Sequence, residues 1–294
     1  MRLIPSFFIV GPPRTGTSWL HEILKHRVIL PRFSKETRFF DVHFHRGLGW
    51  YQSHYPSSDG ARRVGEIAPT YFASHEARQR IRQLVPAAKI VCIFRNPIER
   101  LFSLYRVKRA YGMIPWEFEE AWLRDHELTE SSKYATHFED WQRAFGRDRV
   151  LPAFYEDLRD MPQPFVDRLA DFIGFPRFPV TPRESRMVHA AEAMTHPRSY
   201  RRTRNATFLA EWLKARRFGK FVEAVKGSPV GKLFLGGGPA FSPPSPGAVL
   251  TIVHSCRSEI ERLEIMTNRD LTRWKEPPDW VQVDAFLKTE SVYF

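Results

Sequence analysis

The fold is decided by the stretch LIPSFFIVGPPRTGTSWLHEILK, residues 3–25. Its first part, Leu3–Val10, is a short apolar run that ends at a glycine, as a buried parallel strand does. Its last part, Thr15–Lys25, has apolar residues at helical spacing and predicts a helix. The turn between them therefore joins a strand to a helix N-terminus. This arrangement presents consecutive backbone N–H groups to an anion such as phosphate.

Strands and helices continue to alternate along the chain. Asn96 is the expected N-cap of one helix, with Pro97 at its first position. Alternation of this kind predicts an α/β fold, with a P-loop-type parallel sheet flanked by helices on both faces, in a single domain over residues 1–294. The further strands expected are Val64–Ala68, Lys89–Phe94 and Arg149–Tyr155, and the further helices are His75–Leu84, Trp116–His126, Ser131–Phe145, Gln163–Ile173 and Val249–Thr267.

The pattern weakens from Phe175 to about Gly247. Prolines and arginines dominate residues 176–204. Residues 226–247 are rich in Gly, Pro and Ser and predict a loop at the entrance for an acceptor.

Composition indicates a globular protein with an anionic partner. The chain has 294 residues, 43% of them hydrophobic, and a net charge of +12. A nucleotide, an acidic glycan, an anionic membrane surface or nucleic acid would suit that charge. The basic residues are spread along the chain and no nucleic-acid-binding signature is present, so we favour a small ligand and expect no nucleic acid.

The two cysteines, Cys92 and Cys256, are too few for a disulfide framework or a metal cluster. Buried free thiols are favoured over a disulfide between them, and we expect a cytoplasmic chain. No apolar stretch reaches the length of a membrane span, and the N-terminal run resembles a strand rather than a signal peptide. Peripheral membrane contact and the oligomeric state are left open.

The residues of the turn discriminate between kinds of phosphate ligand. Pro12 and Pro13 have no N–H, so the cradle comes from Arg14–Ser18, and Arg14 adds a cation. An ATP-binding P-loop requires G-x-x-x-x-G-K-[ST], and here Thr17 occupies the lysine position. A nucleotide kinase is therefore the second hypothesis, and an ordinary glycine turn that caps a helix is the structural alternative.

A second segment, IVCIFRNPIERLFSLY at residues 90–105, places Arg95 at the carboxyl end of a predicted core strand. Ligands of open α/β sheets bind at that end. Ser103 lies about two turns into the following helix.

Together these segments resemble the PAPS-dependent sulfotransferases, where PAPS is 3′-phosphoadenosine 5′-phosphosulfate, especially the bacterial members and the heparan-sulfate-type branch. The resemblance implies PAPS as donor, PAP as product and no required metal. It implies that the turn binds the 5′-phosphosulfate and that Arg95 and Ser103 bind the 3′-phosphate. The family usually has Lys where this chain has Arg14. The donor-binding residues so predicted are Pro13, Arg14, Thr15, Gly16, Thr17, Ser18, Arg95, Ser103 and Arg198.

The segment KETRFFD, residues 35–41, resembles the K-E-x-x-F-F-D segment of the heparan-sulfate-type branch. The resemblance implies that Glu36 is the general base, with Lys35 and Arg14 in the catalytic set, and that Asp41 faces the acceptor. The alternatives are a solvated charge run, or a histidine base such as His43, His45 or His54.

Three further stretches resemble the family more loosely. GEIAPTY, residues 65–71, makes Glu66 a second candidate for acid–base chemistry or acceptor contact, but has Ile67 where the heparan-sulfate-type branch has Lys. Residues 186–198 resemble an arginine-rich loop over the donor, which makes Arg198, Arg201 and Arg202 candidates. Residues 258–274 resemble a C-terminal packing helix.

The acceptor implied is a hydroxyl or amine of a carbohydrate or glycolipid. A sugar would suit the aromatic side chains, and a lipid-linked or phenolic acceptor would suit them nearly as well. A nucleotide- or glycan-binding module without transfer activity is the third hypothesis. The aromatic residues considered are Trp50, Tyr51, Trp116 and Trp122.

Overall fold

The computed structural model describes residues 4–56, 62–188, 194–216 and 237–281, together with residues 218, 221–222, 224–225 and 228. The chain divides into two compact units. The first is Met1–Arg95 with His137–Glu192, and the second is Asn96–Thr136 with Ala193–Phe294. The single domain over residues 1–294 stays a prediction.

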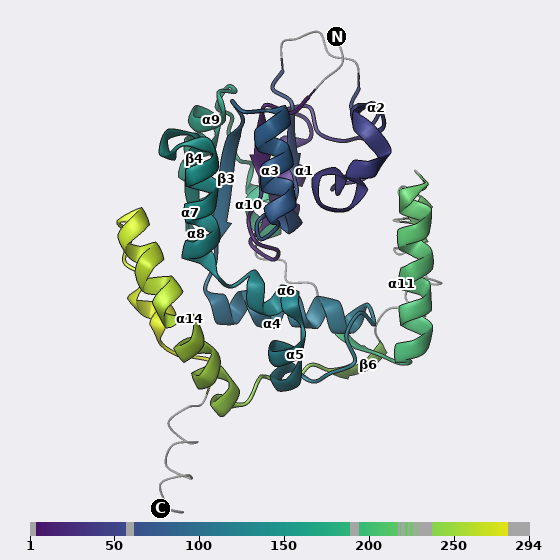
Figure 1. Ribbon diagram of the computed structural model, residues 1–294. Helices are drawn as coiled ribbons and strands as arrows, with labels where there is room; N and C mark the ends of the chain where they lie inside the picture. Colours follow the sequence, from purple (N-terminus) through teal and green to yellow (C-terminus); the bar gives the residue numbers. More distant parts are fainter. Residues whose placement is uncertain are drawn as a thin grey trace, which may run out of the picture. The chain divides into compact units, whose positions relative to one another are not determined.

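The first unit is built on a parallel sheet with strand order β2-β1-β3-β4. The sheet confirms the predicted fold class (Figure 1). Phe7 of β1 pairs with Gly65 of β2 and with Lys89 of β3, and Ile90 of β3 pairs with Val150 of β4. Only glycine fits opposite Phe7, because a Cβ at position 65 would lie 2.1 Å from the Phe7 ring. The strands are β1 (Phe7–Ile9), β2 (Gly65–Ile67), β3 (Lys89–Phe94) and β4 (Val150–Phe154).

Helices cover both faces of this sheet because successive side chains of a strand point to opposite sides. Phe7 and Ile9 lie in one core cluster with residues of α1 (Thr17–Leu24) and α9 (Pro162–Ile173). On the other face, Phe8 packs edge-on against Phe40, with ring centroids 5.6 Å apart. Phe94 packs against Phe138 of α7 (Tyr134–Phe145), with centroids 5.5 Å apart.

The helix α3 (His75–Leu84) has the predicted bounds. Two of its arginines contact the rest of the first unit: Arg78 pairs with Asp140 at 2.8 Å, and Arg80 donates to the carbonyl of Phe40 at 2.6 Å. The shorter elements of this unit were not predicted, because helices of three to seven residues are too short to show a clear periodicity. They are η1 (Phe39–His43, a π-helix), η2 (Phe44–Arg46), α2 (Gly47–Gln52), η3 (Pro69–Tyr71), η4 (Arg147–Arg149), α8 (Tyr155–Asp160) and α10 (Pro182–Val188).

The second unit is organised around α4 (Pro97–Ala110). Asn96 caps this helix as predicted, accepting hydrogen bonds from the N–H groups of Ile98 and Glu99. Arg100 is fully buried and donates to the hydroxyls of Tyr134, Ser131 and Ser132 at 2.7–3.0 Å, which compensates for its desolvation. The other helices of this part are α5 (Phe118–Arg124), α6 (His126–Glu130), α14 (Pro246–Thr267) and η5 (Thr272–Lys275).

The C-terminal helix is a packing element, as the resemblance implied. Trp274 of η5 is buried, and Glu264 of α14 accepts a hydrogen bond from the N–H of Leu271 at 2.8 Å. The weakly patterned region contains α11 (Tyr200–Ala215) and the antiparallel pair β5 (Thr195–Pro197) and β6 (Gly237–Ala240), none of which was predicted. His189 and residues 229–236 of the predicted loop lie outside the described residues.

Candidate active site

The turn between β1 and α1 has the geometry of an anion cradle. Thr15 closes it by donating from Oγ1 to the carbonyl of Pro12 at 2.9 Å. Gly16 is the N-cap of α1, has a φ of 85° and makes no side-chain cap hydrogen bond. The N–H groups of the first turn of α1 are therefore left to a ligand or solvent rather than to a capping side chain. Arg14 has a left-handed φ of 74°, a strained conformation for a residue other than glycine that is common at functional sites.

Gly16 also lies against a wall that leaves no room for a side chain. A Cβ there would approach Tyr155 and Leu158 to 3.2 Å. Tyr155 is the first residue of α8 and follows β4 directly. Tyr155 carries no motif in the sequence and was not predicted, although its place at the carboxyl end of a parallel strand, where ligands bind, is a signal for a functional residue.

Arg95 lies at the carboxyl end of β3, beside the turn, as predicted. Its Nη1 donates to the carbonyl of Arg14 at 3.4 Å. Its guanidinium carbon lies 4.4 Å from the centroid of the Tyr155 ring, within the range of a cation–π interaction. Two strand ends therefore contribute to the position of Arg95.

Lys35 connects the turn to the predicted base. Its Nζ donates to Ser18 Oγ at 3.0 Å and to Thr17 Oγ1 at 3.4 Å. The same Nζ lies 3.6 Å from Glu36 Oε1. An ATP-binding P-loop has a lysine where this chain has Thr17. In the folded chain Lys35, 18 positions later in the sequence, brings a lysine ammonium group to that place. Because Lys35 makes these contacts within the protein, it is not a purely solvated charge, which was the alternative for this segment.

Burial changes the protonation equilibria of these groups. Burial raises the pKa of Glu36 above its ordinary value, and the nearby Lys35 opposes this effect. Burial lowers the pKa of Lys35, again against the opposing charge of Glu36. His21 on α1 also has a lowered pKa, first because of burial and then because of Lys35. His21 was missed because a single histidine on a helix carries no motif.

Glu66 is fully buried and holds the segment that carries Glu36. Its Oε1 accepts hydrogen bonds from the N–H of Thr37 at 3.0 Å and from Thr37 Oγ1 at 2.6 Å. The hydroxyls of Tyr71 and Tyr51 donate to Oε1 at 3.2 Å and to Oε2 at 2.7 Å. Burial raises the pKa of Glu66. These contacts make Glu66 a positioning residue, and its predicted role in acid–base chemistry or acceptor contact stays a prediction.

The residues predicted to face the acceptor differ in how far their side chains are exposed to solvent. Asp41 lies on η1 and is paired with Arg38 at 3.1 Å, and its side chain is 10% exposed. Tyr51 is fully buried, so the prediction that it stacks on a sugar is wrong, and the reason is its hydrogen bond to Glu66 within the core. Trp50 is half-buried and lies 5.1 Å from the Arg46 guanidinium. Ile67 of β2 is fully buried and lies in the same core cluster as Ile9, with which it is paired in the sheet.

Two predicted donor-binding residues belong to the second unit. Ser103 is buried on α4. Arg198 follows β5 directly, and its Nε donates to the carbonyl of Gly237 at 3.2 Å. Their approach to the turn and Arg95 stays a prediction.

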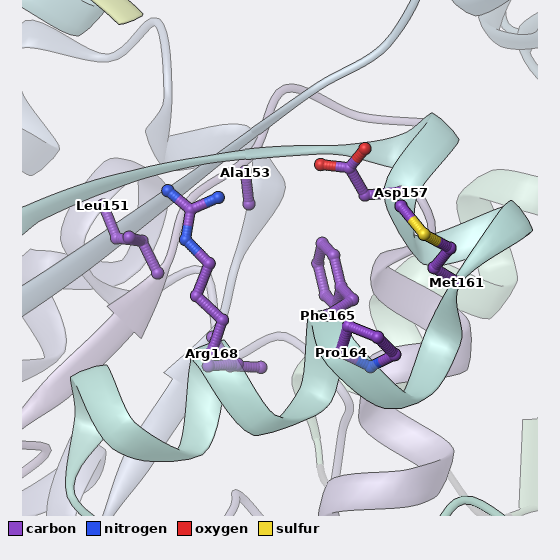
Figure 2. A pocket seen from close by; sticks show the side chains of 8 residues that line it. Leu151, Ala153, Asp157, Met161, Pro164, Phe165 and Arg168 are labelled. Atoms are coloured by element: carbon purple, nitrogen blue, oxygen red, sulfur yellow. The ribbon is translucent and has the colours of Figure 1, made fainter.

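A small pocket of about 120 Å³ is lined mainly by residues of β4, α8 and α9. Figure 2 shows the side chains that line it. The pocket contains none of the predicted site residues. Among the described residues, no three His, Cys, Asp or Glu side chains are grouped to hold a metal ion. None of the described helices is long and apolar enough to cross a membrane. The pocket is lined by Leu151, Ala153, Asp157, Met161, Pro164, Phe165, Arg168 and Leu169.

Comparison with known proteins gives a consistent result. A family model described as "Sulfotransferase domain" matches residues 5–209. The chain is 29% identical over 194 residues to mouse bifunctional heparan sulfate N-deacetylase/N-sulfotransferase 4, which covers 58% of this chain and 22% of that protein. It is 30% identical over 190 residues to human heparan sulfate glucosamine 3-O-sulfotransferase 6, which covers 60% of this chain and 54% of that protein. The chain thus spans about a fifth to a half of the length of these relatives.

Among solved structures, a sulfotransferase from Alicyclobacillus acidocaldarius matches with a TM-score of 0.66 and 20% sequence identity. The match covers 93% of this chain and all of the other. At this identity the similarity establishes a shared fold.

Proposed function

Because the chain belongs to the family of PAPS-dependent sulfotransferases, we propose that it transfers the sulfonyl group of PAPS to a hydroxyl or amine of a carbohydrate or glycolipid. The observation that carries the proposal is the position of Lys35, whose Nζ lies 3.0 Å from Ser18 of the turn and 3.6 Å from Glu36. One cation thereby joins the expected donor site to the expected base.

In this proposal the turn and Arg95 of the first unit bind the donor, together with Ser103 of the second unit. The uncapped N-terminus of α1 receives the 5′-phosphosulfate, and Gly16 permits its close approach. Arg95 and Ser103 bind the 3′-phosphate. Arg14, ahead of Gly16, adds positive charge to the same group.

The chemical step is an in-line displacement at sulfur. A bond forms between the acceptor oxygen or nitrogen and sulfur as the bond from sulfur to the 5′-phosphate oxygen breaks. Glu36 takes the acceptor proton, and its raised pKa makes it a stronger base than an ordinary carboxylate. Lys35 and Arg14 neutralise the charge that grows on the leaving phosphate of PAP. The step requires no metal.

The proposed acceptor class is supported by the relatives. Their names include N-sulfation of heparan sulfate and 3-O-sulfation of its glucosamine, which are reactions at an amine and a hydroxyl of a sugar. Trp50, which is half-buried, supplies an aromatic surface for a sugar ring. Ile67 lies in the core in place of a lysine, so we do not extend the proposal to a heparan-like polyanion.

The test combines a transfer assay with nucleotide binding. Labelled PAPS is incubated with the protein and a panel of glycans and glycolipids. Glu36→Gln is expected to lower turnover by about 10²–10⁴-fold. The variant should still bind PAP, which at a hundredfold excess over Kd stabilises a protein by about 2.7 kcal/mol. Glu22→Gln, an exposed carboxylate on α1, is the matched control and should keep full turnover.

Three results would contradict the proposal. Unchanged turnover in Glu36→Gln would exclude Glu36 as the base. Stabilisation by ATP–Mg²⁺ but not by PAP would favour a nucleotide kinase. Binding of PAP without transfer to any member of the panel would favour a binding module.

A further inference from the structure

Helix α11 in the second unit carries its large apolar side chains on its solvent side. Phe208, Leu209 and Trp212 are 63%, 57% and 52% exposed. The inward side holds small residues instead: Thr203 is buried, and Thr207 Oγ1 donates to the carbonyl of Tyr111 at 2.7 Å. A helix that covers a core shows the opposite pattern. The apolar side chains of α11 are therefore not there to stabilise their own unit.

Arginines frame these apolar side chains. The guanidinium of Arg216 lies 3.6 Å from the centroid of a Trp212 ring, and that of Arg204 lies 5.5 Å from the Phe208 ring. We call these five residues, Arg204, Phe208, Leu209, Trp212 and Arg216, the outer face of α11. Residues 200–216 contain five Lys or Arg against one Glu, a net charge of +4. The outer face thus combines three large apolar side chains with two arginines, on a basic helix (α11 in Figure 1).

We propose that the outer face of α11 docks on the surface of an anionic lipid bilayer. Trp, Phe and Leu prefer the boundary between headgroups and acyl chains, and arginines bind the lipid phosphates and carboxylates. An anionic bilayer therefore offers an environment for both the apolar side chains and the arginines of the outer face. An acidic glycan would pair with the arginines but leave Leu209 in water, and a second copy of the chain would bring two sets of arginines together.

This inference is independent of the proposed function. No residue of the outer face belongs to the predicted donor or acceptor sites, so loss of docking and loss of transfer can be measured separately. Docking would place the enzyme at a membrane surface, where a lipid-linked acceptor is presented.

The experiment measures co-sedimentation of the full chain with vesicles. One set contains phosphatidylcholine alone, and the other contains about one third phosphatidylserine, at about 0.1 M salt. We expect at least about tenfold tighter binding to the anionic vesicles, and loss of this preference at about 1 M salt. The triple variant Phe208→Ser, Leu209→Ser, Trp212→Ser should weaken binding by about tenfold or more. Arg204→Glu with Arg216→Glu should abolish the preference for phosphatidylserine.

The matched control changes exposed apolar residues elsewhere in the same unit. Leu123 on α5 and Ile265 on α14 are 76% and 82% exposed, and their replacement by Ser should leave vesicle binding unchanged. The proposal would be overturned if the wild type bound both kinds of vesicle equally well. It would also be overturned if the triple-serine variant bound anionic vesicles as tightly as the wild type does. A dimer in sedimentation that the triple-serine variant loses, without vesicle binding, would assign the face to a second copy and also overturn it.

Discussion

Replacement of Glu66 by alanine should separate positioning from chemistry in this site. Four hydrogen bonds end on the buried carboxylate, two of them from Thr37. Thr37 follows Glu36 directly, so the carboxylate of Glu66 fixes the backbone beside the proposed base. Its removal takes the acceptor from the N–H of Thr37 and leaves a cavity beside Tyr51 and Tyr71.

The magnitude follows from these contacts. A buried N–H that loses its acceptor costs about 1–3 kcal/mol. The lost volume of a buried side chain costs about 2 kcal/mol more. We therefore expect Glu66→Ala to lower the free energy of unfolding by about 3–5 kcal/mol. Turnover should fall by up to about 10²-fold, because a catalytic group displaced by 1 Å loses about that factor.

Glu66→Gln distinguishes the hydrogen bonds from the charge. Its amide oxygen can still accept from Thr37, so its loss of stability should be about 1 kcal/mol. Burial raises the pKa of Glu66 above its ordinary value of 4.5. Protonation of Glu66 therefore favours the folded state. This contribution to the free energy of unfolding is fully present below pH 4.5 and is lost as the pH rises through the raised pKa. Relative to the wild type, Glu66→Gln should therefore gain stability as the pH rises through that window.

The assay is denaturant unfolding as a function of pH, with transfer measured where each variant is folded. Glu120→Ala removes an exposed carboxylate paired with Arg124 and should change stability by less than about 0.5 kcal/mol. The reasoning would be refuted if Glu66→Ala cost less than about 1 kcal/mol, since a group with four buried hydrogen bonds cannot be so dispensable.

Three further predictions concern the turn, Lys35 and the thiols. Gly16→Ala places a methyl group at a φ of 85° and within 3.2 Å of Tyr155. It should lower the free energy of unfolding by about 1–2 kcal/mol and abolish the rise in melting temperature caused by PAP. The control Gly49→Ala, whose Cβ would meet open space, should do neither. Lys35→Met removes the cation that lowers the pKa of Glu36, so the acidic limb of kcat/KM against pH should move to higher pH, and an unmoved limb would separate Lys35 from the base. Burial raises the pKa of Cys92, and raises that of Cys256 to about 12, so neither thiol should react with a thiol reagent at neutral pH until the protein unfolds; rapid labelling of the native protein would contradict this.

The sequence alone determined the local elements that have a strong pattern. The apolar runs of β1 and β3, the cap at Asn96 and the turn around Gly16 were predicted, because hydrophobic periodicity and capping act over a few residues. The family resemblance carried by the turn and by Arg95 is confirmed. Buried free thiols at Cys92 and Cys256 are also confirmed. Residues 200–215 gave no clear helical signal, because polar and basic residues dominate the first half of the helix and its large apolar residues are confined to the second half.

Only the tertiary structure decided which distant residues meet. Lys35 reaches the hydroxyls of Thr17 and Ser18, and Tyr155 lies against Gly16 and Arg95, through folding of the chain around the sheet. The sequence made Glu66 a candidate for acid–base chemistry or acceptor contact, and only the tertiary structure shows that it anchors the backbone of Thr37. These contacts join residues up to 139 positions apart, and packing rather than local propensity brings them together.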